Sequence, residues 1–403
     1  MAALKYWIWL SDANVSTRAK AEILRRYGGA EQAFFAPTGE LAALENVRRE
    51  DAAVLERRDL ERAERVMDEC QRQKLGIITY DDRDYPTRLK NIFAPPVVLY
   101  VRGALPRVDD NAVIAVVGTR RATDYGVRMA RAIAGEIVRC GGIVASGLTA
   151  GIDAAGAVGA LGAGGTCIGV LGTAHELSEG RLAEEVAEYG ALVSEYAPGS
   201  EQRRSFFRDR NRVTAGLSVG AVAVEAPERS GTRLFIEEAA EQGKEIFAVP
   251  ANADAAMSAG TLSYLKDGAK LVTRGWDVMS EFEWRFPGRV NRPEICAERP
   301  EIAALAGGGR AQKRAARRNK TKKVIDKENN RRYIDLKDQL GQLSEPQLKI
   351  VNAIAPGGSH IDDIIETTGL TTAAVLAQLT VLEIKGFVRR EAGRRIMLNT
   401  AKK

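Results

Sequence analysis

Apolar residues between positions 76 and 285 gather in short runs that alternate with longer stretches of helical spacing. The short runs have the length of β-strands and occupy residues 76–80, 97–101, 113–117, 142–145, 166–171, 191–194, 221–225 and 245–249. Helical spacing falls between several of them, notably over residues 124–139, 231–242 and 261–266. Strands that alternate with helices form βαβ units, so the pattern predicts an α/β, Rossmann-like core with a mainly parallel, doubly wound sheet.

Residues 1–75 are expected to form helices. Ser16 is a suitable cap for a helix that ends at Tyr27, because Gly28-Gly29 follows it. Further along, apolar residues recur at helical intervals, at Val54, Leu55, Leu60, Val66 and Met67. Acidic residues interleave with the many arginines, so we expect an N-terminal helical domain with a solvated face. A Gly-Gly hairpin that contacts phosphate is the alternative.

The pattern breaks over residues 286–340. Residues 310–323 contain eight lysines or arginines and no acidic residue, and Gly307, Gly308 and Gly309 come just before them. This composition predicts a flexible basic linker. Two roles remain open for it: non-specific attraction to nucleic acid, or a solubilising tether.

A compact pattern returns over residues 341–403. Ser344 and Pro346 open a helix, residues 361–367 and 371–384 form two more, and residues 387–390 and 395–398 flank a turn at Gly393. Three helices followed by a β-wing predict a winged-helix domain. The third helix carries no positive charge before Lys385, so phosphate attraction there is weak. We therefore favour a protein-contact or dimer-modulating role over sequence-specific DNA recognition.

Charge and composition narrow the partners and the compartment. The formal net charge is +6 and the pI about 9.1, which favours an anionic partner. The four cysteines form no CxxC pair and the two histidines have no partner at metal-ligand spacing, so we expect no metal site and no disulfide framework. No apolar run is long enough for a membrane span. These features predict a cytoplasmic protein without a membrane partner.

The first candidate binding site is Gly118-Thr119-Arg120, at the end of the apolar run 113–117. Ligands of open α/β sheets bind outside the carboxyl ends of the strands. Glycine lets an anion approach the backbone, and arginine supplies a forked positive charge, so the turn suits phosphate. The chain has neither GxGxxG after this strand nor a GxxxxGK[ST] loop, and we expect no NAD or ATP cofactor.

Two more strand ends repeat the arrangement. Ser146-Gly147 follows the run 142–145, and Gly172 follows the run 166–171. A glycine at such a turn is usually a matter of tight packing, but three turns along one edge predict a rim that binds anions.

Aromatic and basic residues come together between positions 206 and 212. Phe206 and Phe207 are followed by Arg210, Asn211 and Arg212. Guanidinium groups bind phosphates, and an aromatic ring stacks on a base. We expect one phenylalanine to lie in the core and the other, Phe207, to be available to a ligand.

Taken in order, these segments resemble the DprA family (DNA-processing protein A, also called Smf). The resemblance rests on Val117-Gly118-Thr119-Arg120, Ser146-Gly147-Leu148 with Gly151-Ile152-Asp153, Val170-Leu171-Gly172, Ser194-Glu195-Tyr196, Arg210-Asn211-Arg212, Val224-Glu225-Ala226 with Ser230-Gly231, and Phe247-Ala248-Val249-Pro250. It implies an extended Rossmann fold that binds single-stranded DNA in a basic pocket, with Gly231 among the site residues. It also implies a homodimer that helps load the recombinase RecA in natural transformation, without enzymatic turnover.

The chain departs from the family pattern at three places that bear on the pocket. Ala157 replaces a histidine that usually follows Gly-Ile-Asp, Asp209 stands where a basic residue is tolerated, and Phe235 lies in a stretch that is usually small and hydroxylated.

Two other functions compete with this interpretation. LOG-type nucleoside-monophosphate phosphoribohydrolases use a GGxGTxxE motif, but the third residue after Thr232 is Phe235 and Glu237 comes two positions later. A transcription factor with a small-molecule sensor core is the third hypothesis, and the recognition helix, which is acidic at Glu383 and has no basic residue, argues against it.

Overall fold

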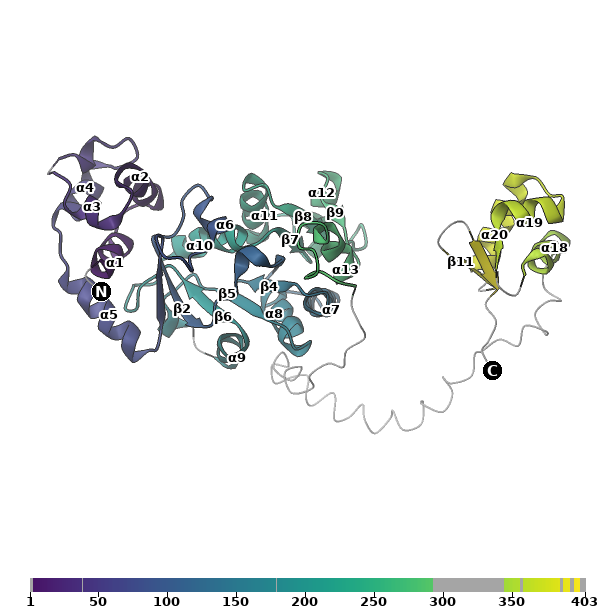
Figure 1. Cartoon of the computed structure of the whole chain (residues 1–403), viewed down its shortest axis with the longest axis horizontal. Coiled ribbons are helices and arrows are strands. Elements are labelled where there is room, and N and C mark those ends of the chain that lie inside the picture. Colours follow the sequence, from purple (N-terminus) through teal and green to yellow (C-terminus); the bar gives the residue numbers. More distant parts are fainter. Residues whose placement is uncertain are drawn as a thin grey trace. The chain divides into compact units, whose positions relative to one another are not determined.

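The computed structural model describes residues 3–37, 39–178, 180–292, 344–355, 358–384, 387–391 and 395–398. It divides into two compact units, one with the N-terminal helices and the large sheet, the other with the C-terminal helices (Figure 1). From residue 293 to residue 340 the predicted basic linker lies outside the described residues.

The first unit is built on a nine-stranded sheet of order β1-β2-β6-β5-β4-β3-β7-β8-β9. Neighbouring strands from β6 to β9 are parallel, whereas β1 and β2 are antiparallel to their neighbours. The prediction of a mainly parallel sheet is therefore confirmed. The strands are β1 (Gly76–Thr79), β2 (Val98–Gly103), β3 (Val113–Val117), β4 (Ile143–Ser146), β5 (Cys167–Val170), β6 (Ala191–Ser194), β7 (Gly220–Ala223), β8 (Glu245–Ala248) and β9 (Lys270–Leu271).

Helices cover both faces of this sheet, as Figure 1 shows. Ile114 and Val116 of β3 pack with α7 and α8, whereas Ala115 and Val117 pack with α10 and α11. Because β3 is buried on both faces, its sequence is a continuous apolar run rather than an alternating one. The helices of this unit around the sheet are α6 (Thr87–Lys90), α7 (Asp124–Arg139), α8 (Ile152–Gly162), α9 (Arg181–Tyr189), α10 (Arg204–Leu217), α11 (Gly231–Glu241), α12 (Ala259–Lys266) and α13 (Gly275–Met279).

The topology places a switch point at β3. The chain runs from β3 through α7 to β4 on one side, and it later returns through α10 to β7 on the other side of β3. At such a point, the carboxyl ends of the strands open onto a crevice where ligands of doubly wound sheets bind.

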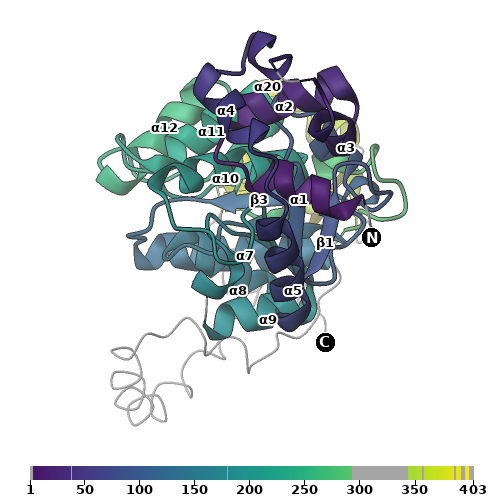
Figure 2. The ribbon, with the colours of Figure 1, turned by 90° about the vertical axis from the view of Figure 1, so that its left-hand side faces the viewer.

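The N-terminal helices pack against the β1–β2 edge of the sheet, and Figure 2 shows α1 and α5 beside β1. The predicted cap is confirmed, because Ser16 Oγ accepts a hydrogen bond from the backbone N–H of Ala19 at 3.1 Å. The helix ends at Gly28, whose φ of +74° favours glycine. These helices are α1 (Leu4–Asp12), α2 (Thr17–Tyr27), α3 (Ala30–Phe34), α4 (Arg49–Glu56) and α5 (Glu61–Arg72).

The second unit has its own apolar core, in which Ile350, Ile364 and Leu379 are fully buried. Its elements are α18 (Glu345–Ala353), β10 (Ser359–His360), α19 (Ile361–Thr368), α20 (Thr372–Ile384), β11 (Val388–Glu391) and β12 (Arg395–Leu398). The three strands pair in the order β10-β12-β11, so the predicted winged helix is confirmed.

Candidate nucleic-acid interface

The turn that follows β3 is held from two sides. The backbone N–H of Thr119 donates to the carbonyl oxygen of Glu225 (2.8 Å), and the Thr119 carbonyl accepts from the N–H of Ile152 (3.2 Å). A Cβ at Gly118 would lie 2.6 Å from a side-chain carbon of Ile152, so the turn needs glycine there. Thr119 is buried, and Arg120 is exposed beyond it. The fold therefore presents Arg120 from a fixed backbone.

The turn after β4 is held by a buried hydroxyl. Ser146 Oγ donates to the carbonyl oxygen of Asp153 (2.9 Å) and accepts from the N–H of Leu148 (3.1 Å). Leu148 has a φ of +53°, a left-handed conformation that non-glycine residues adopt at a cost. Ser146 is fully buried and thus fixes the turn instead of facing solvent.

Arg210 of α10 lies against this turn. Its Nη1 donates to the carbonyl oxygen of Gly147 (3.1 Å), and a Cβ at Gly147 would lie 2.5 Å from that nitrogen. Burial lowers the pKa of Arg210, an effect that nearby Asp153 opposes and Arg120 reinforces. A guanidinium stays protonated after such a decrease. The site therefore holds two positive charges close together.

Phe207 occupies the corresponding place at the end of β5. A Cβ at Gly172 would lie 3.0 Å from Cδ1 of Phe207, so the ring packs on the glycine. Cζ of Arg120 is 5.6 Å from the centroid of the same ring, a cation–π distance. We call the group Arg120, Gly147, Gly172, Phe207 and Arg210 the strand-end cluster.

The glycines of the strand-end cluster make room for neighbouring side chains rather than for an anion that approaches the backbone. Gly147 makes room for Arg210 and Gly172 for Phe207, while the N–H groups of Thr119 and Leu148 are donated to atoms of the protein. Positive charge at this edge therefore comes from the arginine side chains. Asn211, next to Arg210, is buried, and its Oδ1 lies 3.5 Å from Nη2 of Arg210.

The expectation that one of the two phenylalanines lies in the core is wrong. Phe206 and Phe207 are both half-buried, because they lie near the start of α10, where Ser205 and Arg208 are exposed, whereas Val213 and Leu217 further along the helix pack on the sheet. The Phe206 ring stacks on Tyr196, with centroids 3.7 Å apart and planes 11° apart.

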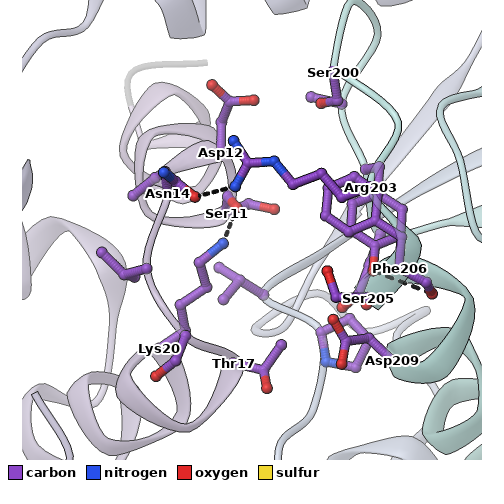
Figure 3. A pocket seen from close by; sticks show the side chains of 18 of the residues that line it. Ser11, Asp12, Asn14, Thr17, Lys20, Ser200, Arg203, Ser205, Phe206 and Asp209 are labelled. Atoms are coloured by element: carbon purple, nitrogen blue, oxygen red, sulfur yellow. Dashed lines mark hydrogen bonds between the residues drawn. The ribbon is translucent and has the colours of Figure 1, made fainter. Parts of the chain in front are cut away.

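Arg212 lies on another face of α10 than Arg210. Two residues along an α-helix are separated by roughly 200°, at about 100° per residue. Nη2 of Arg212 donates to Oε2 of Glu195 (2.5 Å), and each of the two side chains is 10% exposed. Figure 3 shows the cleft that they line, of about 730 Å³ between the N-terminal helices and α10, where Arg203 reaches Asn14. Phosphate binding by Arg212 stays a prediction.

Gly231 also lies on another element. It is the first residue of α11 and is exposed, and a Cβ there would meet no atom within 4 Å. No contact between Gly231 and the strand-end cluster supports its predicted role, which stays a prediction.

Sequence reasoning missed the role of Glu225, which follows β7. Its Oε2 accepts from the N–H of Thr123 (2.9 Å), and its Oε1 accepts from the Thr123 hydroxyl (2.5 Å). Thr123 is the cap of α7, and a Cβ at Gly126 would lie 2.3 Å from Oε2. An internal carboxylate thus occupies the helix N-terminus where nucleotide-binding folds place a phosphate.

His175 and the described cysteines of the first unit are buried and do not belong to the strand-end cluster. His175 is buried, with Nε2 2.9 Å from the carbonyl oxygen of Tyr100, and burial lowers its pKa. Burial raises the pKa of each free thiol at Cys70, Cys140 and Cys167 to about 12.

Among the described residues, no group of acidic, histidine or cysteine side chains could hold a metal ion. None of the helices in this part of the chain is long and apolar enough to cross a membrane.

Comparison with known proteins places this geometry in a family. The family model of DNA recombination-mediator protein A matches residues 76–283, and the model of the DprA winged helix domain matches residues 336–394. Protein Smf of Synechocystis is 30% identical over 347 residues, which cover 82% of this chain and 81% of Smf. The DNA processing protein DprA of Bacillus subtilis is 32% identical over 225 residues, covering 55% of this chain and 76% of the relative.

A solved structure agrees with these sequence matches. The X-ray structure of DprA from Streptococcus pneumoniae superposes with a TM-score of 0.61 at 29% identity, covering 69% of this chain and 98% of that one. The chain therefore belongs to the DprA/Smf family of DNA recombination mediators.

Proposed function

We propose that this protein binds single-stranded DNA at the strand-end cluster. The observation that carries the proposal is the convergence of Arg120, Arg210 and the Phe207 ring at the carboxyl edge of the sheet. Two segments that are far apart in sequence, the turn after β3 and the helix α10, supply two guanidinium groups and an aromatic ring. This combination matches the charged groove and stacking platform of single-strand-binding sites.

The chemistry of the cluster favours single strands over duplex. A flexible single strand exposes base faces, and stacking on a ring contributes about 1–3 kcal/mol per base. Phosphate contacts by Arg120 and Arg210 carry no base information. We therefore expect tight binding of single strands with little dependence on sequence.

The proposal extends to the biological role that family membership supports. In this role a cytoplasmic homodimer protects incoming single strands and helps load the RecA recombinase during DNA uptake and recombination. The protein acts by binding and has no catalytic turnover.

The geometry around α11 supports this choice over a phosphoribohydrolase. Phe235 is buried in the core, and Glu237 forms an exposed ion pair with Arg233 (2.7 Å). The Glu237 carboxylate is thus paired with Arg233 on the surface of the same helix. Neither residue supplies the free carboxylate that such an enzyme needs.

A titration of labelled oligonucleotides at physiological salt tests the proposal. A homopolymer and a mixed-sequence single strand should bind with similar affinity, and a duplex of the mixed sequence should bind more weakly. Equal affinity for the single strand and the duplex would refute the proposed preference.

A further inference from the structure

A second cleft lies between α2 and the segment that follows α6. Its volume is about 390 Å³, and it is lined by polar and aromatic residues that include Arg18, Arg25, Tyr80, Lys90 and Phe93. The strand-end cluster supplies none of its lining residues. We call it the N-terminal cleft.

Phe93 is unusually exposed for an aromatic residue at the edge of a cleft. Its side chain is 77% exposed, although Ile92 and Ala94 on either side are buried. The backbone is therefore anchored while the ring projects into solvent. An exposed ring that gains nothing from the core of its own protein is suited to a stacking partner.

Positive charge accompanies the aromatic rings. Cζ of Arg18 is 5.5 Å from the centroid of Phe93, and Nζ of Lys90 is 5.0 Å from that of Tyr80. Neither cation forms an ion pair with a residue that the structure describes, whereas Arg25 is paired with Glu22. None of the described residues that line the cleft is acidic. The cleft therefore offers two uncompensated cations beside two rings.

Nearby aspartates reduce this positive field without entering the cleft. Asp81, Asp82 and Asp84 follow Tyr80 in the chain, but none of them lines the cleft. The Asp82 carboxylate accepts from the N–H of Thr79 at 2.6 Å and so is committed to its own turn.

We propose that the N-terminal cleft is a second contact site for the same single strand, with Phe93 stacking on a base and Arg18 and Lys90 neutralising phosphates. The inference rests on the proposed function. Rings combined with cations match a single strand, whereas a duplex hides its base faces and an apolar peptide would leave the cations without counterions.

The larger cleft of Figure 3 lies between the two sites in terms of its lining residues. Pro95 lines both the N-terminal cleft and the larger cleft of Figure 3. Phe206 lines that larger cleft, and the next residue, Phe207, belongs to the strand-end cluster. A strand that leaves the cluster across α10 would pass this larger cleft, whose lining holds both cations and carboxylates, before it reaches Phe93, so only a sufficiently long strand reaches the N-terminal cleft.

A length series of labelled oligo-dT tests the inference on the full chain. Short strands should bind wild type and Phe93→Ala equally. For strands long enough to reach the cleft, Phe93→Ala should bind roughly 5- to 150-fold more weakly, the factor that corresponds to one stacked base. Lys90→Ala and Arg18→Ala should each flatten the salt dependence by about 0.7 for long strands only.

Trp284→Ala is the matched control, because this side chain is 81% exposed but lies outside the cleft. Arg120→Ala should weaken binding at every length, so it separates the two sites. If Phe93→Ala binds all lengths as wild type does, or loses no more than Trp284→Ala, the inference is overturned while the strand-end cluster stands. If wild type binds no single strand, the proposed function itself fails.

Discussion

Nη1 of Arg210 donates a hydrogen bond of 3.1 Å to the carbonyl oxygen of Gly147, 63 residues earlier in the chain. The contact joins α10 to the turn after β4 and fixes the direction of the guanidinium. Only glycine leaves room for it, since a Cβ would come within 2.5 Å of the same nitrogen. One hydrogen bond thus sets the position of a charge at the carboxyl edge, while Nη2 lies 3.5 Å from Oδ1 of Asn211 and Nε is buried.

Arg120→Ala is expected to weaken single-strand binding and to flatten the slope of log K against log salt by about 0.7, because one phosphate contact is lost. The fold should be unaffected, since the Arg120 side chain is exposed. Fluorescence anisotropy over a range of salt concentrations measures the slope. Arg107→Ala is the control, because this side chain is 90% exposed and precedes β3 in the chain, so it lies near the amino end of that strand and away from the carboxyl edge. An unchanged slope in a folded Arg120→Ala protein would contradict the site.

Gly147→Ala is expected to displace Arg210, because the new Cβ would collide with the guanidinium. The colliding atoms are the end of a flexible side chain, so most of the stability should remain while single-strand affinity falls about as much as in Arg210→Ala. Gly162→Ala in α8 is a matched control, since a Cβ there meets no atom within 4 Å. Wild-type affinity in Gly147→Ala would show that the position of Arg210 is unimportant for DNA.

The sequence predicts the parts of this site that depend on local pattern. The apolar run of β3 and the glycines at positions 118, 147 and 172 place three strand ends on one edge, because parallel strands share their carboxyl ends. Packing around glycine is not a local property. That Gly147 receives Arg210 and Gly172 receives Phe207 requires the course of α10 across the sheet, which no spacing in the sequence gives.

The separation of Arg210 from Arg212 could be predicted from the sequence, whereas the contact of Glu225 with Thr123 could not. Helical geometry alone separates Arg210 from Arg212, because residues two apart lie roughly 200° apart at 3.6 residues per turn. Glu225 gives no comparable indication, since its partner Thr123 is 102 residues away. The short strand β9 was also missed, because both of its residues are exposed and it has no apolar pattern.

Arg212→Met is expected to destabilise the protein by about 3–5 kcal/mol, because Glu195 would remain as a buried charge without its partner. Urea unfolding measures the loss, and the salt slope of the folded fraction tests separately whether Arg212 also contacts a phosphate. The double variant Arg212→Met with Glu195→Gln should recover part of the stability, since the two residues are in contact. Unchanged stability with a flatter slope would instead assign Arg212 to a phosphate.

Nucleotide cofactors are expected to bind no better than millimolar, because Glu225 already occupies the N-terminus of α7. Calorimetric titration with NAD and with ATP checks this, and micromolar affinity for either would contradict it. Glu225→Ala should lower the melting temperature through the loss of both hydrogen bonds to Thr123. The matched control is Glu228→Ala, a residue in the loop before α11 that has no hydrogen bond of this kind among the described residues.

Asp209→Asn is expected to stabilise the protein at neutral pH. Burial raises the pKa of Asp209 and Glu195 raises it further, while Arg212 opposes both. Between the unfolded pKa of about 3.9 and the higher folded value, the native state binds more protons than the unfolded state. Stability contributed by this group therefore falls as pH rises through that window and stays lower above it.

The asparagine removes this penalty, so the difference in unfolding free energy between variant and wild type should grow from pH 4 to pH 7. Urea unfolding at several pH values measures it, with Asp84→Asn as the control because Asp84 lies on an exposed loop. Greater stability at pH 7 would mean that the folded protein tolerates Asp209 at a cost. A variant less stable than wild type at every pH would show instead that the Asp209 carboxylate anchors Arg212 or Lys20 across the cleft of Figure 3.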